Sequence, residues 1–229
     1  MKRLSCAIVG VFPCILIASA AQAGLIDDFS QGEQYLDHAV DPDDFDEVGP
    51  LNGVFGDGYR ALSLDVTGEG YAITQVDTDD HLWATSISGV TSAAAQVAYR
   101  SESGATLLPP LGTPSNTLFR ATVVFADQPL QLTALLLDKN NDAASLTLAI
   151  TATESPYVVS ELLADFTFSD FDFSSVKKIT FTLTGPTAWD AELGLLETTA
   201  VPEPSSLLLG LAATGVVGVV AARRRRKRG

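Results

Sequence analysis

Short segments of alternating apolar and polar residues constrain the fold of this chain more than any other feature. In residues 61–67, Leu62, Leu64 and Val66 are separated by polar residues. Because successive side chains of a strand point to opposite faces, such a segment predicts a β-strand with one buried face. The same pattern appears in residues 95–99, 119–125, 130–137, 145–151, 179–184 and 189–196, and more weakly in residues 71–76.

Turn-forming residues separate these segments. Glycine, proline or asparagine clusters lie at residues 56–58, 67–70, 109–112, 139–142 and 185–186. No part of the body sustains the 3.6-residue apolar period of an amphipathic helix. Roughly nine short strands without βαβ alternation predict an all-β fold, an antiparallel β-sandwich of jelly-roll type. We expect it to form one domain over residues 24–197.

The first 23 residues have the layout of a secretory signal peptide. Two basic residues follow the initial methionine, an apolar stretch covers residues 4–20, and Ala21 and Ala23 form a small-x-small cleavage site. We expect cleavage after Ala23, so that the mature chain begins at Gly24; the alternative is an uncleaved N-terminal anchor. Both cysteines lie in this leader, so the mature protein would contain no disulfide and no cysteine-based metal site.

The C-terminal segment has three parts in order. A linker over residues 198–204 carries Pro202, Glu203 and Pro204, an uncharged run covers residues 205–222, and residues 223–229 are basic. As a helix the run would span about 27 Å, close to the hydrocarbon thickness of a bilayer, which predicts a single transmembrane helix. Basic residues stay cytoplasmic, so the body would lie on the opposite side. The membrane-stop cluster consists of Arg223, Arg224, Arg225, Arg226, Lys227 and Arg228.

Proline gives the linker its expected shape. Each proline fixes its own φ, lacks an amide hydrogen and pushes the preceding residue towards extended backbone. A helix therefore does not grow backwards from the membrane through Glu203. The extended backbone suits a protease cleft, and the lone carboxylate of Glu203 offers a feature by which a basic pocket would recognise it.

This three-part tail resembles the PEP-CTERM sorting signal of exported proteins in Gram-negative bacteria that make exopolysaccharide. In that family an exosortase, a membrane-embedded cysteine protease, recognises the Pro-Glu-Pro motif and is thought to cut near it. The resemblance implies export through the Sec machinery and a transient stay in the inner membrane with the body in the periplasm. Delivery to the cell surface or the extracellular space would follow. An ordinary single-pass anchor is the alternative.

A second resemblance involves the body. The run Leu25-Ile26-Asp27-Asp28-Phe29-Ser30 and the later run Gly53-Val54-Phe55-Gly56-Asp57-Gly58-Tyr59-Arg60 are similar to sandwich domains often carried ahead of this signal. The similarity agrees with the fold predicted from alternation.

The charge of the body excludes one class of partner. Of the 28 acidic residues only Glu203 lies outside residues 24–200, whereas eight of the 14 basic residues lie in the two terminal segments. So acidic a surface repels phosphate backbones, and we expect no nucleic-acid binding.

Clustered carboxylates are candidate calcium ligands, because calcium prefers six to eight oxygen atoms. The candidate site consists of Asp41, Asp43, Asp44 and Asp46, and a solvated loop is the competing interpretation. Residues 138–142 begin like an EF-hand loop but lack its later glycine and glutamate, so they predict a hairpin turn. No other cofactor is expected.

Aromatic side chains are the candidates for sugar binding. Trp83 follows an acidic loop and is the candidate exposed glycan platform among them, although core packing is the favoured interpretation. Trp189 and Tyr99 fall on the apolar sides of their strands, so we expect both to be buried.

We expect no enzymatic activity. The mature chain has only two histidines, His38 and His81, and no nucleophile elbow or phosphate-binding loop. The sequence therefore predicts a structural or adhesive protein associated with exopolysaccharide. A carbohydrate-binding module is the alternative, and an extracellular hydrolase that uses paired carboxylates comes third.

Overall fold

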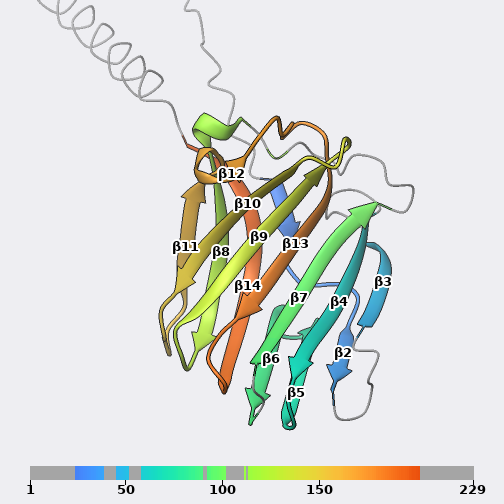
Figure 1. The fold of residues 1–229 in the computed structure, drawn as a ribbon, viewed down its shortest axis with the longest axis vertical. Coiled ribbons are helices and arrows are strands. Elements are labelled where there is room, and N and C mark those ends of the chain that lie inside the picture. Colours follow the sequence, from blue (N-terminus) through green and yellow to red (C-terminus); the bar gives the residue numbers. More distant parts are fainter. Residues whose placement is uncertain are drawn as a thin grey trace, which may run out of the picture. The chain divides into compact units, whose positions relative to one another are not determined.

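Two antiparallel β-sheets packed face to face make up the part of the chain that the computed structural model describes (Figure 1). This part comprises residues 24–38, 45–51, 58–89, 92–101, 111 and 113–201. The predicted all-β antiparallel sandwich is confirmed.

Each sheet contains seven strands. Sheet A has, in spatial order, β11 (Tyr157–Leu162), β8 (Thr117–Ala126), β14 (Trp189–Ala200), β6 (Leu82–Ser88), β5 (Tyr71–Asp77) and β2 (Gln34–Asp37), and β1 (Gly24–Asp27) pairs with β14. Sheet B has β12 (Thr167–Phe168), β10 (Ala143–Ile150), β9 (Leu130–Asp138), β13 (Val176–Thr184), β7 (Ser92–Ser101), β4 (Gly58–Thr67) and β3 (Phe45–Leu51). Two single-turn 3₁₀ helices, η1 (Pro114–Asn116) and η2 (Leu163–Asp165), complete the description.

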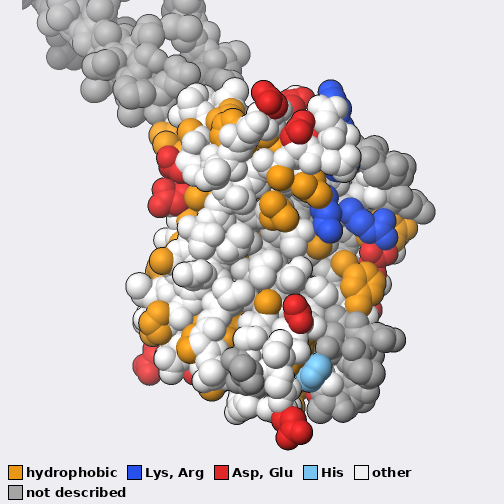
Figure 2. Space-filling model, in the orientation of Figure 1, with side chains coloured by type: hydrophobic (Ala, Val, Ile, Leu, Met, Phe, Trp, Pro, Cys, Tyr) orange, Lys and Arg blue, Asp and Glu red, His pale blue; other side chains and the backbone are white. Residues whose placement is uncertain are grey.

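The core lies between the sheets and is built from the apolar faces of the alternating strands. The rings of Phe119 on β8 and Phe181 on β13 stack with their centroids 5.4 Å apart, which joins sheet A to sheet B. Tyr99 meets Phe181 edge-on at 6.1 Å. Trp189 and Tyr99 are both buried, as predicted. On the face seen in Figure 2, hydrophobic side chains appear only in small separate groups.

The hairpin predicted at residues 138–142 is confirmed. Oδ1 of Asp138 accepts hydrogen bonds from the backbone N–H groups of Asn140 at 2.8 Å and Asp142 at 3.0 Å. Asn141 has a φ of 72°, a left-handed conformation that asparagine tolerates well. The Asp138 side chain thus stabilises the turn that links β9 to β10.

The last strand continues beyond residue 197, where we expected the domain to end. β14 runs to Ala200, and the Thr198 hydroxyl lies 3.4 Å from the carbonyl oxygen of Gly24 on β1. The backbone N–H of Val201 then donates to the carbonyl of Asn116 at 2.6 Å. Residues 198–200, expected to be linker, are therefore part of sheet A.

The predicted signal peptide, the Pro202–Glu203–Pro204 motif, the helix over residues 205–222 and the basic cluster lie outside the described residues. Among the residues that are described, none forms a helix with the length and apolar character needed to span a bilayer.

Candidate functional site

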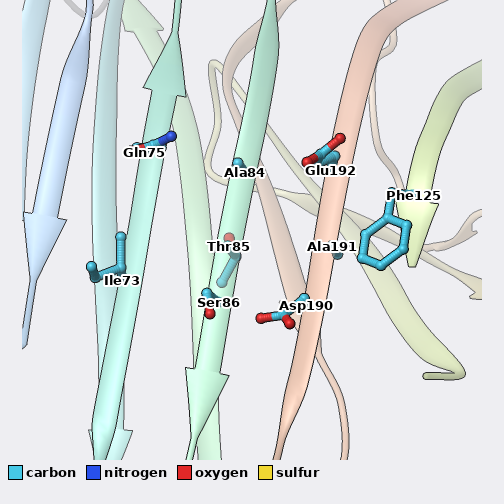
Figure 3. A pocket seen from close by; sticks show the side chains of 9 residues that line it. All are labelled: Ile73, Gln75, Ala84, Thr85, Ser86, Phe125, Asp190, Ala191 and Glu192. Atoms are coloured by element: carbon cyan, nitrogen blue, oxygen red, sulfur yellow. The ribbon is translucent and has the colours of Figure 1, made fainter. Parts of the chain in front are cut away.

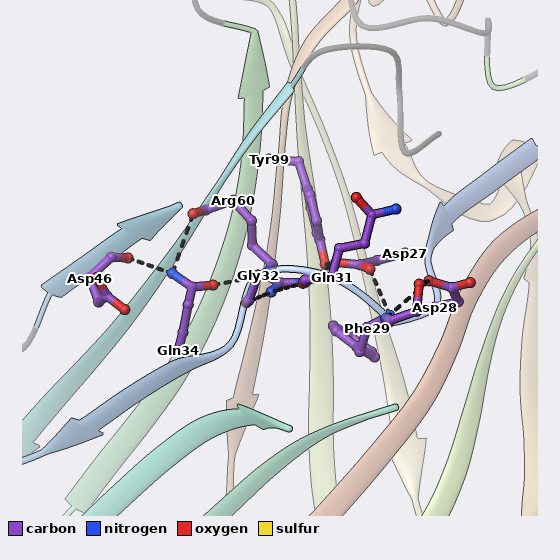
Figure 4. A network of polar contacts seen from close by, with 10 residues as sticks. Asp27, Asp28, Phe29, Gln31, Gly32, Gln34, Asp46, Arg60 and Tyr99 are labelled. Carbon is purple, nitrogen blue, oxygen red and sulfur yellow. Dashed lines mark hydrogen bonds and ion pairs between the residues drawn. The ribbon is translucent and has the colours of Figure 1, made fainter. Parts of the chain in front are cut away.

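A charged network lies in the interior of the domain, around the fully buried side chain of Arg60 (Figure 4). Its Nη1 donates to Oδ2 of Asp27 at 2.8 Å, and its Nε donates to Oε1 of Gln34 at 2.7 Å. Nη2 donates to the backbone carbonyls of Gln31 and Gly32. The guanidinium is therefore surrounded by oxygen acceptors.

Asp27 has further partners. The Tyr99 hydroxyl donates to its Oδ2 at 2.6 Å, and the backbone N–H of Phe29 donates to its Oδ1 at 2.7 Å. Burial, and then the negative charge of Asp27, raise the pKa of Tyr99 well above its usual value. The phenol therefore stays protonated and serves as a hydrogen-bond donor to the carboxylate.

This network holds the two sheets together. Asp27 and Gln34 come from β1 and β2 of sheet A, whereas Arg60 and Tyr99 come from β4 and β7 of sheet B. All four side chains are at most 2% exposed, so no substrate reaches them. A buried charge that is paired and fully hydrogen-bonded fits a structural role.

The most distinctive accessible feature is a groove on the outer face of sheet A (Figure 3). Its volume is about 330 Å³, within the size range of small-ligand sites. The β6 groove is lined by Ile73 and Gln75 of β5, Ala84, Thr85 and Ser86 of β6, Asp190, Ala191 and Glu192 of β14, and Phe125 of β8.

The register of the strands explains the hollow. Ala84 on β6 lies between Gln75 and Glu192, and Ser86, two residues further along β6, lies between Ile73 and Asp190. Side chains directly opposite on neighbouring strands stand about 5 Å apart. Two small residues on the middle strand therefore leave a trough between longer side chains on each side.

The acidic side of the groove is held in position by a turn. The backbone N–H of Asp190 donates to Oδ1 of Asp127 at 2.7 Å, and the Asp127 N–H donates to the Asp190 carbonyl at 3.1 Å. Trp189, the residue before Asp190, is buried in the core. The start of β14 is thus fixed, and with it the two carboxylates that line the groove.

Two exposed tyrosines lie on the same face of sheet A. Tyr35 is 54% exposed and Tyr71 is 43% exposed. Partial desolvation and then the Asp37 carboxylate raise the pKa of Tyr35. Tyr35 pairs with Gln75, four positions along β5 from Tyr71. Tyr71 pairs with Ser88, two residues beyond Ser86 on β6, so it stands at one end of the row of small side chains.

A second hollow, about 510 Å³ in volume, lies near the turns that follow β8 and β13. No ionisable side chain lines it, and its residues are Pro129, Leu130, Gln131, Ala149, Ile150, Thr151, Thr184, Gly185 and Pro186. This second hollow is larger than the β6 groove, but the β6 groove offers more polar groups that could orient a ligand.

The structure does not support the candidate glycan platform at Trp83. Trp83 is fully buried and its Nε1 donates to Thr74 Oγ1 at 2.9 Å. The candidate glycan platform at Trp83 is therefore wrong, and the favoured interpretation of core packing is confirmed. Its burial follows from β6, whose alternation turns Trp83 inward and Ala84 outward. Sequence reasoning did not find the β6 groove, because its lining residues come from four strands.

The candidate calcium ligands lie mostly beyond what the structure describes. Asp41, Asp43 and Asp44 fall outside the described residues, and Asp46 lies on β3, where its backbone carbonyl accepts a hydrogen bond from Gln34 Nε2 at 3.0 Å. Within the described ranges, no group of three or more His, Cys, Asp or Glu side chains is arranged to hold a metal ion. Calcium binding by the acidic loop stays a prediction.

These observations define the class of fold as an antiparallel β-sandwich. The family model described as the PEP-CTERM protein-sorting motif matches residues 200–226. The resemblance predicted from the tail is thereby confirmed, and the chain carries a sorting signal of exported proteins.

Several solved structures align with this chain at low sequence identity and with TM-scores below 0.5. A family 11 carbohydrate-binding module from Clostridium thermocellum, in complex with a β-1,3-1,4-mixed-linked tetrasaccharide, is 10% identical, with a TM-score of 0.41 over 80% of this chain and 98% of that one. A family 30 carbohydrate-binding module of a C. thermocellum cellulosomal cellulase is 14% identical, with a TM-score of 0.40 over 62% and 83%. The agarase AgWH50C is 13% identical, with a TM-score of 0.41 over 78% of this chain and 26% of that enzyme. A comparison with curated proteins returns no match.

Proposed function

We propose that this is an exported protein that an exosortase recognises through Pro202, Glu203 and Pro204 and cleaves near that motif. After a transient stay in the inner membrane, with its body in the periplasm, the sandwich reaches the cell surface or the extracellular matrix. There it has a structural or adhesive role associated with exopolysaccharide. The match of residues 200–226 to the sorting motif carries this proposal.

The position of the motif along the chain supports it. β14 ends at Ala200, and Val201 is the one residue between that strand and Pro202. Proline offers no N–H for a further ladder bond and disfavours helix at the residue before it. The last described strand thus ends where the matched sorting signal starts.

The test is Glu203→Ala in the native host, followed by the mass and the location of the mature protein. We expect the variant to stay full-length and membrane-associated, while wild type appears in a shortened form outside the inner membrane. Glu154→Ala, at an exposed position between β10 and β11, is the matched control and should be processed normally. Unchanged release of a shortened Glu203→Ala product would contradict recognition through this residue.

The β6 groove favours a second candidate function, that of a carbohydrate-binding module. Ligand sites typically combine an apolar or aromatic surface with a few placed polar groups, and the groove offers Phe125 with Asp190, Glu192 and Gln75. We interpret the strand order as a jelly roll, an architecture that recurs in lectin domains. An extracellular hydrolase that uses Asp190 and Glu192 ranks third, and release of shortened sugar fragments would distinguish it.

A further inference from the structure

We propose that the β6 groove binds an unbranched, uncharged oligosaccharide laid along β6, with Tyr71 at one end and the carboxylates of Asp190 and Glu192 along one side. This inference rests on the second candidate function, a carbohydrate-binding module, and specifies its site and its ligand class.

The shape of the groove favours an elongated ligand. The small outward positions Ala84, Ser86 and Ser88 follow one another along a single strand. At a strand rise of about 3.4 Å per residue they form a row about 14 Å long, more than one sugar ring requires. The floor reaches the backbone beside the buried Thr85, so a flat chain lies close to the sheet.

The polar groups favour a ligand rich in hydroxyls. Asp190 and Glu192 are two residues apart on β14, so their side chains emerge on one face about 7 Å from each other. Ionised carboxylates accept hydrogen bonds only, whereas sugar hydroxyls donate them, and such charge-assisted bonds are stronger than neutral ones. On the opposite side, the Gln75 amide both donates and accepts.

The charge of the groove selects against acidic polymers. No lysine or arginine is among its lining residues, so nothing in the wall neutralises the two carboxylates. The two carboxylates would repel a uronate or sulfate group, and the charge of that group would stay unpaired in the groove. Such repulsion is an effective basis for specificity. A neutral glycan meets neither penalty.

Aromatic side chains mark where sugar faces would rest. Tyr71, opposite Ser88, is 43% exposed, and Tyr35 on β2, opposite Gln75, is 54% exposed. Phe125 pairs with Glu192 and lines the other side of the groove. Exposed rings with a polar tip combine apolar contact area with hydrogen bonding.

The experiment measures binding of full-length protein, purified in mild detergent, to cellohexaose, xylohexaose, agaro-oligosaccharides and mixed-linked β-glucan, with polygalacturonate as the acidic probe. Ala84→Trp fills the trough from an outward-facing position. Ser160→Trp is the matched control, because it places the same ring at an exposed position of β11 on the far edge of sheet A. Circular dichroism establishes that both variants are folded.

We expect wild type to bind at least one neutral probe and not polygalacturonate. Ala84→Trp should weaken that binding about tenfold or more, and Ser160→Trp should leave it unchanged. The near-isosteric Asp190→Asn/Glu192→Gln variant keeps the shape; it should weaken neutral binding several-fold and reduce the discrimination against polygalacturonate.

Three results would overturn the proposal. Glycan binding that survives Ala84→Trp would leave the carbohydrate-binding module standing but place its site elsewhere. Preference for polygalacturonate would refute the ligand class, and absence of binding to every neutral probe would refute both the groove and the module. None of these results bears on sorting, which the Glu203→Ala experiment tests separately.

Discussion

Nη1 of Arg60 lies 2.8 Å from Oδ2 of Asp27, and this ion pair joins sheet B to sheet A inside the core. Only a matched set of acceptors makes such burial tolerable, because an unpaired charge in the interior is costly. The carboxylate, the amide oxygen of Gln34 and two backbone carbonyls supply that set.

Arg60→Met should lower the free energy of unfolding by about 3–5 kcal/mol, because it leaves the Asp27 carboxylate buried without its cation. Arg100→Met is the matched control, since its ion pair with Glu47, at 2.7 Å, is largely exposed. There we expect a loss below about 1 kcal/mol. Urea unfolding of both variants measures the difference. Equal losses in the free energy of unfolding would show that the buried ion pair contributes no more to stability than the exposed one.

Tyr99→Phe should change how stability depends on alkaline pH. Burial and Asp27 raise the pKa of Tyr99 in the folded state, whereas in the unfolded state it stays near 10.0. Above pH 10 the unfolded chain therefore binds fewer protons than the folded one, and this contribution to wild-type stability is lost as the pH rises. At neutral pH the substitution costs about 1–3 kcal/mol, because Asp27 loses a donor.

Unfolding curves at pH 7, 9 and 11 provide the measurement for Tyr99→Phe. The stability gap between wild type and Tyr99→Phe should narrow at pH 11. A gap of constant size at all three values would mean that Tyr99 does not stay protonated in the fold.

Gly185→Ala should destabilise the protein, because a Cβ there would lie 2.4 Å from Leu130 Cδ2 and 2.7 Å from Trp189 Cδ1. Relief of that overlap requires movement of the core and costs about 1–3 kcal/mol. Gly194→Ala is the matched control, since its nearest neighbour would be Val124 Cγ2 at 3.5 Å. Thermal unfolding should show a lower midpoint for the first variant and little change for the second; similar midpoints would contradict the packing described here.

The mature protein should begin at Gly24, which N-terminal sequencing of the exported form checks. β1 starts at Gly24 and pairs with the last strand, and three residues later Asp27 binds Arg60. A mature chain that started after Asp27 would lose the buried ion pair. Recovery of such a chain in folded form would contradict both the expected cleavage site and the structural importance of the network.

Strands with a strong contrast between their two faces were predictable from sequence. In β4 and β13 large apolar residues alternate with polar ones, and this contrast fixes which face packs inward. The short strands β1, β2 and β12 were not predicted, because two to four residues give too little periodicity. β3 and β11 were not predicted either.

β6 was not predicted from the sequence because its two faces differ little in polarity. Thr85 is buried on its inner face, while Ala84 faces outward, so the usual difference between apolar and polar positions is blurred. Those small outward residues are also what create the β6 groove. The small outward-facing residues therefore explain both why β6 was not predicted and why the candidate binding site forms there.

The buried ion pair shows what one sequence cannot supply. Asp27 and Arg60 are 33 positions apart, and nothing in their local patterns links them. Both nevertheless fall within the two runs singled out from the sequence, residues 25–30 and 53–60; the resemblance expected there stays a prediction. The contact between Asp27 and Arg60, which joins the two sheets, became visible only in three dimensions.

β14 is paired on both edges, with β6 and then β1 on one side and β8 on the other. A pull on Val201 that acts along the strand axis would load the backbone hydrogen bonds to β1, β6 and β8 in shear at the same time. A strand at a sheet edge can instead separate one hydrogen bond at a time. The sandwich is thus connected to the C-terminal segment through a strand that is paired on both edges and not through a sheet edge.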